Sequence, residues 1–225
     1  MCGRYTFAPD LSILGELFPD LALPAELAPR YNIAPTQEVP AVRNDGRRRL
    51  EQLHWGLVPS WAKDRAIGNR LINARAETLA EKPSFRAAFK RRRCLILADG
   101  FYEWQKIPGE RRKQPVHVRL KSGQPFAFAG LWESWRPSDD EGLLSCTIIT
   151  TAPNSLLEPI HDRMPVILRP ADYERWLQEG EQPAAGLAEL LQPYEPAEMQ
   201  AYPVSTLVNS PRNDTPDCIK PLDDG

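Results

Sequence analysis

The sequence predicts a single α+β domain over residues 1–225, in which a curved, barrel-like mixed β-sheet core is flanked by short helices. A chain of 225 residues is long enough to bury roughly 70% of the surface of the unfolded chain. Apolar runs of strand length recur too closely for βαβ units. The 23 prolines, about twice the average usage of ~5%, favour many short elements joined by defined turns. No repeat or linker divides the chain, so the segment from about residue 200 onwards is expected to belong to the same domain.

The first third of the chain predicts one helix and two strands. Residues 10–18 have a leucine stripe with helical spacing, Asp10 is a suitable N-cap, and a proline follows. Residues 39–42 and 50–55 have the character of strands, and the Asp45-Gly46 pair between them is typical of a hairpin turn. We therefore expect a short helix followed by a strand hairpin.

The middle of the chain predicts a short strand, a helix and a buried strand. Asn73 and Arg75 lie two residues apart, so on a strand they share a face. A helix is expected to begin near Pro83 and to end at the basic run 90–93, in a solvated last turn where positive charge complements the helix dipole. Residues 94–98 are continuously apolar, which is typical of a buried strand.

Glu103 has an unusual position in the strand predicted at residues 101–104. Strand alternation places Glu103 on the same face as Phe101 and on the opposite face from Trp104. A carboxylate that points the same way as a large apolar side chain is paired, exposed at a strand end, or functional. Burial would raise its pKa towards the range that suits proton transfer.

The second half of the chain predicts further strands and two helices. Strands are expected at 116–120, 126–132, 144–151 and 202–205, a polar cluster followed by a strand at 160–168, helices at 170–178 and 184–191, turns at 121–123 and 139–142, and an ordered loop at 208–214. Of the three histidines, only His161 lies in a dense polar stretch of sequence. A lone histidine is more often structural than catalytic, so this position by itself leaves both interpretations open.

The charge of the chain excludes one class of DNA-binding protein. The formal net charge is −2, which excludes a strongly basic coat that binds DNA regardless of sequence. Basic residues are nevertheless clustered at 47–49, 90–93 and 111–113, whereas 16 of the 30 acidic residues lie from residue 139 onwards. This asymmetry permits a local basic face.

Cysteine usage and hydropathy predict a cytoplasmic protein with reduced thiols. The four cysteines are irregularly spaced and form no CxxC motif, which argues against a disulfide framework and a structural zinc site. We expect no metal and no cofactor. No apolar stretch reaches ~18 residues, and no basic segment followed by a long apolar run opens the sequence, so neither a membrane span nor a secretory signal is expected.

Cys2 follows the initiator methionine directly, and removal of Met1 is expected because cysteine is small. The chain would then begin with an α-amine and a thiol on adjacent carbons, groups that titrate near ~7.7–8.0 and ~8.5. The amine can condense with an aldehyde to a Schiff base, and the thiol can then close a thiazolidine ring that resists hydrolysis. Cys2 is therefore a candidate aldehyde trap. The alternative is an incidental cysteine at a frayed terminus.

Short blocks of characteristic sequence occur in order along essentially the whole chain. They are MCGR at 1–4, YNIAP at 31–35, WGLVPSW at 55–61, NARAET at 73–78, ADGFYEW at 98–104, HDRMP at 161–165 and VNSPRND at 208–214. In this order the blocks resemble the SRAP family, the SOS-response-associated peptidases, whose members shield abasic sites in bacteria and eukaryotes. A resemblance over so many blocks is far more specific than any one of them.

The resemblance implies that Cys2 forms a covalent thiazolidine crosslink with the ring-opened aldehyde of an abasic site in single-stranded DNA. It also implies that Asn73, Glu103 and His161 are catalytic groups that support Cys2. The family is similar to a thiol autopeptidase, which would here remove Met1. The imine intermediate permits a weak lyase side reaction. We expect a monomer that acts in the cytoplasm on DNA, without a membrane partner.

Positions in or near the blocks are candidates for DNA contacts. Candidate phosphate contacts are Arg4, Arg75, Arg86 and Arg163, and candidates for stacking on bases are Trp55 and Trp61. For each arginine the alternative is a surface ion pair. For each tryptophan the alternative is core packing, because tryptophan is highly buried on average, whereas stacking contributes ~1–3 kcal/mol per base.

Two other functions stay open at this stage. One is a cysteine-dependent peptidase in which Cys2 acts with His161. The other is a module that binds single-stranded DNA without a covalent bond.

Overall fold

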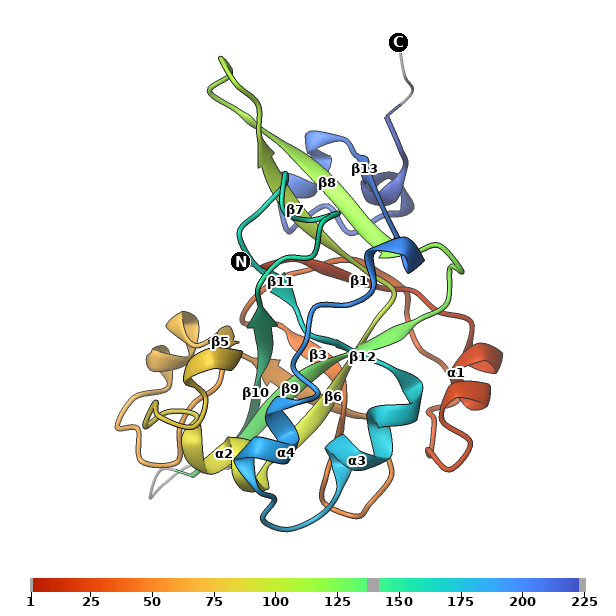
Figure 1. The fold of residues 1–225 in the computed structure, drawn as a ribbon. Coiled ribbons are helices and arrows are strands. Elements are labelled where there is room, and N and C mark those ends of the chain that lie inside the picture. The colour runs from red at the N-terminus through yellow and green to blue at the C-terminus, as the bar shows by residue number, and fades with distance from the viewer. Residues whose placement is uncertain (1, 137–141, 223–225) are drawn as a thin grey trace.

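The computed structural model describes residues 2–136 and 142–222, and a closed five-stranded β-barrel lies at its centre (Figure 1). The barrel strands, in their order around the ring, are β10 (Leu143–Thr151), β4 (Glu51–Trp55), β3 (Glu38–Arg43), β6 (Arg93–Ala98) and β9 (Phe126–Trp135). The ring closes because β9 pairs with β10, from Leu143 opposite Trp135 to Ile148 opposite Gly130. The β10–β4 pair is parallel and the others are antiparallel, so the barrel is mixed.

A second, antiparallel sheet of five strands lies above the barrel in Figure 1. Its strands, in order across the sheet, are β13 (Met199–Pro203), β8 (Lys113–Leu120), β7 (Gly100–Lys106), β1 (Tyr5–Phe7) and β2 (Arg30–Ile33). The chain passes from the barrel into this sheet through Asp99, between β6 and β7. The β7–β8 hairpin extends beyond the rest of the molecule in Figure 1.

The remaining elements are short, as the proline content predicts. Three short strands join the barrel: β5 (Asn73–Arg75) and β11 (Met164–Pro165) on β10, and β12 (Ile167–Leu168) on β9. The helices are α1 (Leu11–Leu17), α2 (Arg86–Arg91), α3 (Tyr173–Leu177) and α4 (Ala184–Ala188). Single 3-10 turns or short 3-10 helices are η1 (Arg65–Arg70), η2 (Ala76–Thr78), η3 (Pro170–Asp172), η4 (Pro196–Glu198), η5 (Thr206–Asn209) and η6 (Pro216–Ile219). No helix within the described ranges is both long and apolar enough to cross a membrane.

Tyr5 joins the second sheet to the barrel. Its buried ring lies edge-on to Trp55 of β4, with ring centroids 5.4 Å apart, and edge-on to Phe128 of β9 at 5.7 Å. Edge-to-face pairs of this kind add about 0.5–1.5 kcal/mol beyond the area that they bury. One large hydrophobic cluster therefore extends from the barrel into β1, which begins three residues after Cys2.

The predicted fold class, an α+β domain with a curved, barrel-like mixed sheet, is confirmed. The predicted helix over 10–18 is α1, and the side chain of its N-cap, Asp10, accepts a hydrogen bond from the N–H of Ser12. The helix expected near Pro83 begins three residues later, at Arg86.

The solvated last turn predicted for the basic run 90–93 is confirmed for Lys90 and Arg91, which are exposed at the end of α2, but is wrong for Arg93. Arg93 is fully buried and is the first residue of β6. Its guanidinium donates hydrogen bonds to four backbone carbonyls, those of Phe89, Lys90, Trp176 and Gln178. Arg93 thereby donates to carbonyls at the C-terminal ends of α2 and α3, where the helix itself provides no N–H donor. Burial lowers its pKa to about 10.

Two predicted strands differ from the observed ones. The strand expected at the end of 160–168 is split into β11 and β12, because Val166 donates to the carbonyl of Ile149 and accepts from the N–H of Ala129. Val166 therefore bridges β10 and β9 at the point where they close the barrel. The last strand, expected at 202–205, begins earlier and is β13. Most of the turn predicted at 139–142 lies outside the described residues.

The predicted loop at 208–214 is held against β1 and β2 by Asn32. The side chain of Asn32 is buried, and its amide N–H group lies within hydrogen-bond distance of three carbonyls, those of Val208 (3.2 Å), Ser210 (3.0 Å) and Asn213 (2.7 Å). Its Oδ1 accepts from Arg4 at 2.9 Å. Asp214 completes the attachment, because its carboxylate accepts the N–H groups of Tyr31 and Asn32.

Asn32→Ala is expected to lower the free energy of unfolding by at least about 2 kcal/mol, because buried carbonyls of the loop lose their donor. Guanidinium chloride denaturation of both proteins measures this difference. Asn213→Ala is the matched control: it removes an exposed side-chain bond to the carbonyl of Leu207 and should cost less than about 0.5 kcal/mol. Equal losses in the two variants would contradict the anchoring role of Asn32.

Candidate active site

Cys2 is part of the folded core and not of a frayed terminus. The residue is fully buried and belongs to the main hydrophobic cluster. Its Sγ lies 3.8 Å from the carbonyl oxygen of Arg4, which also accepts the N–H of Tyr102 on β7. The alternative of an incidental cysteine at a disordered end is therefore wrong.

Asn73 holds the backbone of Cys2. The Nδ2 of Asn73 donates a hydrogen bond of 2.9 Å to the carbonyl oxygen of Cys2, 71 residues away in the sequence. Asn73 is positioned by the parallel pairing of β5 with β10, in which it lies opposite Ile148. Its Oδ1 is buried and accepts no hydrogen bond within the described part of the chain. The Oδ1 of Asn73 can thus accept a hydrogen bond beside Cys2.

Glu103 lies on the core-facing side of β7, as strand alternation predicts. Its side chain is only 2% exposed. The pairing of β7 with β1, with Phe101 opposite Tyr5, brings it beside the segment that begins with Cys2. Burial raises the pKa of Glu103 to about 7. Burial also raises the pKa of the Cys2 thiol well above its usual range, and the negative charge of Glu103 raises it further.

His161 approaches Glu103 from a separate loop. Its Nε2 lies 3.8 Å from Oε2 of Glu103. Its Nδ1 lies 3.0 Å from the backbone nitrogen of Arg163 and 2.9 Å from the exposed carboxylate of Asp162. Burial lowers the pKa of His161, although Asp162 opposes this effect, so the imidazole is mainly neutral near pH 7.

The four predicted catalytic residues therefore converge in two contacts, Asn73 with Cys2 and Glu103 with His161. They come from four segments: the start of the chain, β5, β7 and the loop before β11. Their catalytic roles stay predictions. Two buried titratable groups beside a half-buried histidine are nevertheless typical of sites where protons are transferred.

Sequence reasoning missed Thr150 as a neighbour of this site. In the β5–β10 ladder Thr150 lies opposite Arg75, so its side chain shares a face with that of Asn73. Its Oγ1 is buried and has no hydrogen-bond partner in residues 2–136 and 142–222. The sequence signal was a pair of threonines at the end of an apolar strand, which is too common to single out.

Trp55 cannot stack on a base in this structure, which corrects one predicted DNA contact. Its side chain is fully buried inside the barrel, and its Nε1 donates to the carbonyl of Ile72 at 2.9 Å. Trp61, by contrast, is 59% exposed, and its stacking role stays a prediction. The two residues belong to one sequence block, and only the fold distinguishes them.

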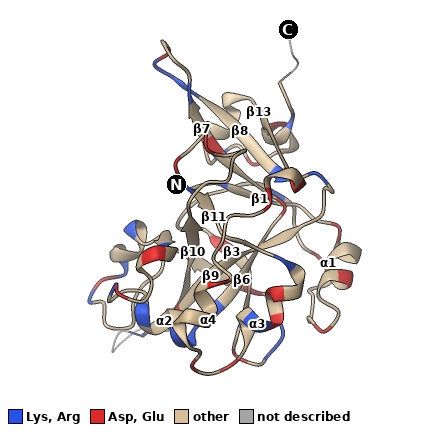
Figure 2. Ribbon diagram, viewed as in Figure 1, with Lys and Arg blue, Asp and Glu red and all other residues tan. Residues whose placement is uncertain are grey.

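The four candidate phosphate contacts differ in how they are bound within the protein. Arg4 donates to Asn32 and to the carbonyls of residues 208 and 209, and Arg163 forms a two-pronged ion pair with Glu77 at 2.7 and 2.9 Å. Arg75 and Arg86 are exposed. Figure 2 shows that lysines and arginines are spread over both sheets and the helices. The roles of these arginines towards DNA stay predictions.

His117 also lies in a polar cluster, which its sequence surroundings did not indicate. It is on β8, 2% exposed, with Nδ1 3.0 Å from the hydroxyl of Tyr202 and Nε2 3.4 Å from that of Thr6. Burial lowers its pKa to about 3, so it stays neutral at physiological pH. An added Cβ at Gly100 would lie 2.3 Å from Nε2, so this glycine is required by close packing. His117 is therefore a structural residue of the second sheet.

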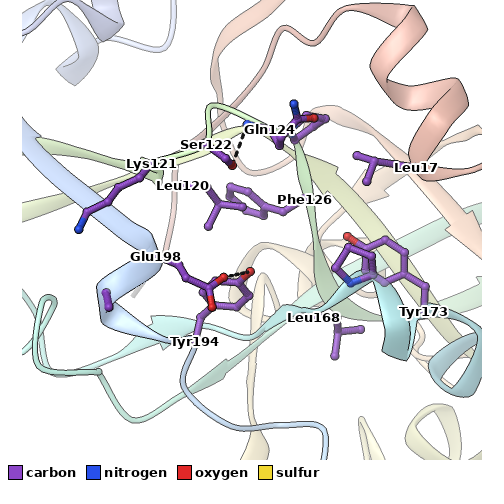
Figure 3. Close-up of a pocket in the computed structure, with 13 residues that line it drawn as sticks. Leu17, Leu120, Lys121, Ser122, Gln124, Phe126, Leu168, Tyr173, Tyr194 and Glu198 are labelled. Carbon is purple, nitrogen blue, oxygen red and sulfur yellow. Dashed lines mark hydrogen bonds between the residues drawn. The ribbon is translucent and has the colours of Figure 1, made fainter.

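A cavity of about 370 Å³ lies elsewhere in the fold and contains none of the four predicted catalytic residues (Figure 3). Its walls are mainly apolar and include Leu17, Phe126 and Tyr173, and on one side Tyr194 donates to Glu198 at 3.1 Å. No group of three or more His, Cys, Asp or Glu side chains in the described ranges is placed to hold a metal ion.

Fold and site together define a class of protein: a β-barrel domain whose second residue is a thiol buried beside a carboxylate and a histidine. The chain belongs to the family of SOS response associated peptidases (SRAP), whose profile matches residues 1–211. The resemblance seen in the sequence blocks is thus confirmed.

The matches to similar proteins extend over most of the chain. The abasic site processing protein YoqW of Bacillus subtilis (strain 168) is 49% identical over 223 residues, which are 98% of this chain and 99% of that protein. The abasic site processing protein HMCES of Rattus norvegicus is 33% identical over 89% of this chain and 67% of its own length. A crystal structure of a protein from Bacteroides thetaiotaomicron matches with a TM-score of 0.86 and 26% identity, over 98% of this chain and 100% of that one.

The raised pKa of Glu103 predicts a pH-dependent stability. A carboxyl whose pKa rises from 4.5 in the unfolded chain to about 7 in the folded one stabilises the fold fully below pH 4.5. That stabilisation is lost as the pH rises to about 7 and amounts to about 3 kcal/mol. Glu103→Gln should remove this dependence. Chemical denaturation of both proteins at a series of pH values between 4.5 and 8 measures it, and parallel curves would contradict the raised pKa.

Proposed function

We propose that this protein recognises abasic sites in single-stranded DNA and crosslinks to them through Cys2, after removal of Met1. One observation carries the proposal: Cys2 is held in the core by Asn73, in the part of the fold where the buried carboxyl of Glu103 lies. A buried 1,2-aminothiol beside a proton acceptor is suited to trapping an aldehyde. Membership of the SRAP family and relatives named abasic site processing proteins support the same substrate.

The first step is opening of the abasic sugar to its aldehyde. This requires movement of one proton, which His161 or Glu103 can supply or accept. The α-amine of Cys2 then attacks the aldehyde carbon as a neutral group, and Glu103 accepts its proton. A carboxyl with a pKa of about 7 can both accept and return a proton near neutral pH. Loss of one water from the adduct gives the imine.

The second step closes the thiazolidine ring. The thiol of Cys2 adds to the imine carbon, its proton passes through Glu103 to the imine nitrogen, and no further group leaves. Burial disfavours the free thiolate, so proton transfer accompanies the attack of sulfur. The bond from Asn73 to the Cys2 carbonyl fixes the orientation of the amine and thiol towards one carbon. Ring closure removes the imine from which β-elimination would start, so any lyase activity is weak.

A cysteine peptidase is the second candidate, and it also accounts for removal of Met1. A peptidase needs a thiolate near neutral pH, usually formed beside a histidine. The raised pKa of the Cys2 thiol opposes this. Because cleavage after Met1 would need the same thiolate, the peptidase ranks second to the crosslink. All four predicted catalytic groups come from one chain, which is consistent with a monomer.

The crosslink is tested with single-stranded DNA that carries one abasic site. The wild-type protein should give a shifted band that survives denaturing electrophoresis. Cys2→Ala and Cys2→Ser should each reduce this band by at least about 100-fold, since they retain the amine but cannot close a stable ring. Borohydride should restore a band in both variants, because it reduces the imine to a stable amine. A heat-stable band from Cys2→Ala without borohydride would overturn the proposal.

Blocking the terminus tests the role of the amine separately. A chain that keeps Met1, or carries a tag before Cys2, has an acylated nitrogen at Cys2 and should form neither the thiazolidine nor the borohydride-trapped product. Mass spectrometry confirms the state of the terminus, and proteolytic removal of the tag to expose Cys2 is the control that should restore crosslinking. Equal crosslinking before and after removal would show that the α-amine is not required.

A further inference from the structure

Two of the three basic clusters in the sequence are paired with acidic side chains of the fold. In the cluster 47–49, the arginines pair with Asp45, Glu174 and Glu51 respectively. In the cluster 90–93, Lys90 and Arg91 pair with Glu181, Arg92 pairs with Glu133, and Arg93 is bonded to carbonyls. The acidic partners of these two clusters thus come from within the chain, and Asp45, Glu51 and Glu181 are each shared between two basic residues.

The third cluster is not neutralised. Arg111, Arg112 and Lys113 lie at the tip of the β7–β8 hairpin, where Lys113 is directly opposite Lys106 in the strand ladder. Across residues 2–136 and 142–222, none of these four side chains forms an ion pair with a carboxylate. The turn contains one acidic residue, Glu110, against four positive charges. We call these four residues the basic arm.

The composition of the basic arm is unfavourable for the hairpin itself. Like charges directly opposite each other on neighbouring strands destabilise a sheet. All four side chains are exposed, and Gly109, at the turn, has a φ of +84° with nothing within 4 Å of an added Cβ. The arm thus projects into solvent, as Figures 1 and 2 show at the free end of β7 and β8. Within the arm, Lys113 acts on the candidate active site, because its charge opposes the rise in the pKa of Glu103.

The basic arm starts directly at the candidate active site. Glu103 lies on the same strand, three residues before Lys106. Gln105 donates at 3.2 Å to the carbonyl of Pro159, in the loop that leads to His161. Consider a polyanionic chain whose reactive unit lies beside Cys2. The part of that chain that extends out of the active site would therefore lie along the basic arm.

We propose that the basic arm binds the phosphate backbone of the DNA that flanks the abasic site. The inference rests on the proposed function and adds a contact outside the reactive centre. Two adjacent arginines and two opposing lysines match a chain of phosphates, each of which carries one charge. Contacts of this type position the strand without reading its sequence. Its two arginines thereby raise affinity for long DNA and leave the chemistry at Cys2 unchanged.

The variant for the test is Arg111→Gln with Arg112→Gln, which removes two charges and leaves Lys113, the arm residue nearest Glu103, in place. The matched control is Arg47→Gln with Lys121→Gln, which removes the same charge from exposed positions outside the arm. A third protein, Arg111→Lys with Arg112→Lys, retains the charge. Equal denaturation midpoints for all variants establish that each is folded.

Binding is measured by fluorescence anisotropy with a labelled single strand of about 20 nucleotides that carries a tetrahydrofuran in place of the abasic sugar, which cannot crosslink. The Gln variant of the arm should bind roughly 10-fold more weakly at about 100 mM salt, and its log–log salt slope should fall by about 1.4. The control and the Lys variant should stay within about twofold of the wild type. Equal affinity of the arm variant and the control would overturn the proposal, as would equally effective competition by polyglutamate.

Crosslinking to a trinucleotide with a central abasic site separates this inference from the proposed function. The wild type and the Gln variant of the arm should react with the trinucleotide at the same rate, because so short a strand does not reach Arg111 and Arg112 at the tip of the hairpin. A lower rate for the variant would overturn the assignment of the arm to flanking DNA. Failure of the wild type to crosslink would overturn the proposed function, whereas the anisotropy result would still decide whether the arm binds DNA.

Discussion

The structure depends on the anchoring of the second residue of the chain. Chain ends are usually the least ordered part of a domain, and a reactive group there would lack a defined position. Here the thiol of Cys2 is buried, the carbonyl of Arg4 lies within reach of it, and Asn73 donates to the Cys2 carbonyl. Tyr5 extends the same anchor into the barrel. The position of this near-terminal residue is thereby fixed in the way that the position of a residue within a sheet is fixed.

Burial determines the electrostatics of the site as well as its geometry. It raises the pKa of Cys2 and Glu103 and lowers that of His161, so each group is shifted towards its neutral form. Neutral groups suit a reaction in which protons move between amine, thiol and aldehyde oxygen. A solvated ion pair of thiolate and imidazolium would instead favour peptide cleavage.

The characteristic blocks of sequence divide into those that meet near Cys2 and those that join parts of the fold. Asn73, Glu103 and His161 lie around Cys2, whereas Asn32 attaches the loop of residues 208–214 to the sheet. The basic clusters also differ, since two are paired with acidic side chains of the fold and one projects at the tip of the β7–β8 hairpin. A sequence motif therefore identifies the family of a chain more readily than the role of each of its residues.

The sequence by itself determined the local features of this protein: the N-cap at Asp10, the face of Glu103, the strand-rich fold class and the cysteine at position 2. These follow from spacing along the chain, which alternation and capping rules describe. Only the tertiary structure decided that Trp55 is buried while Trp61 is exposed, and that Arg93 is a buried cap. Those outcomes depend on contacts between residues far apart in the sequence, such as Arg93 with the end of α3, and no local pattern encodes such partners.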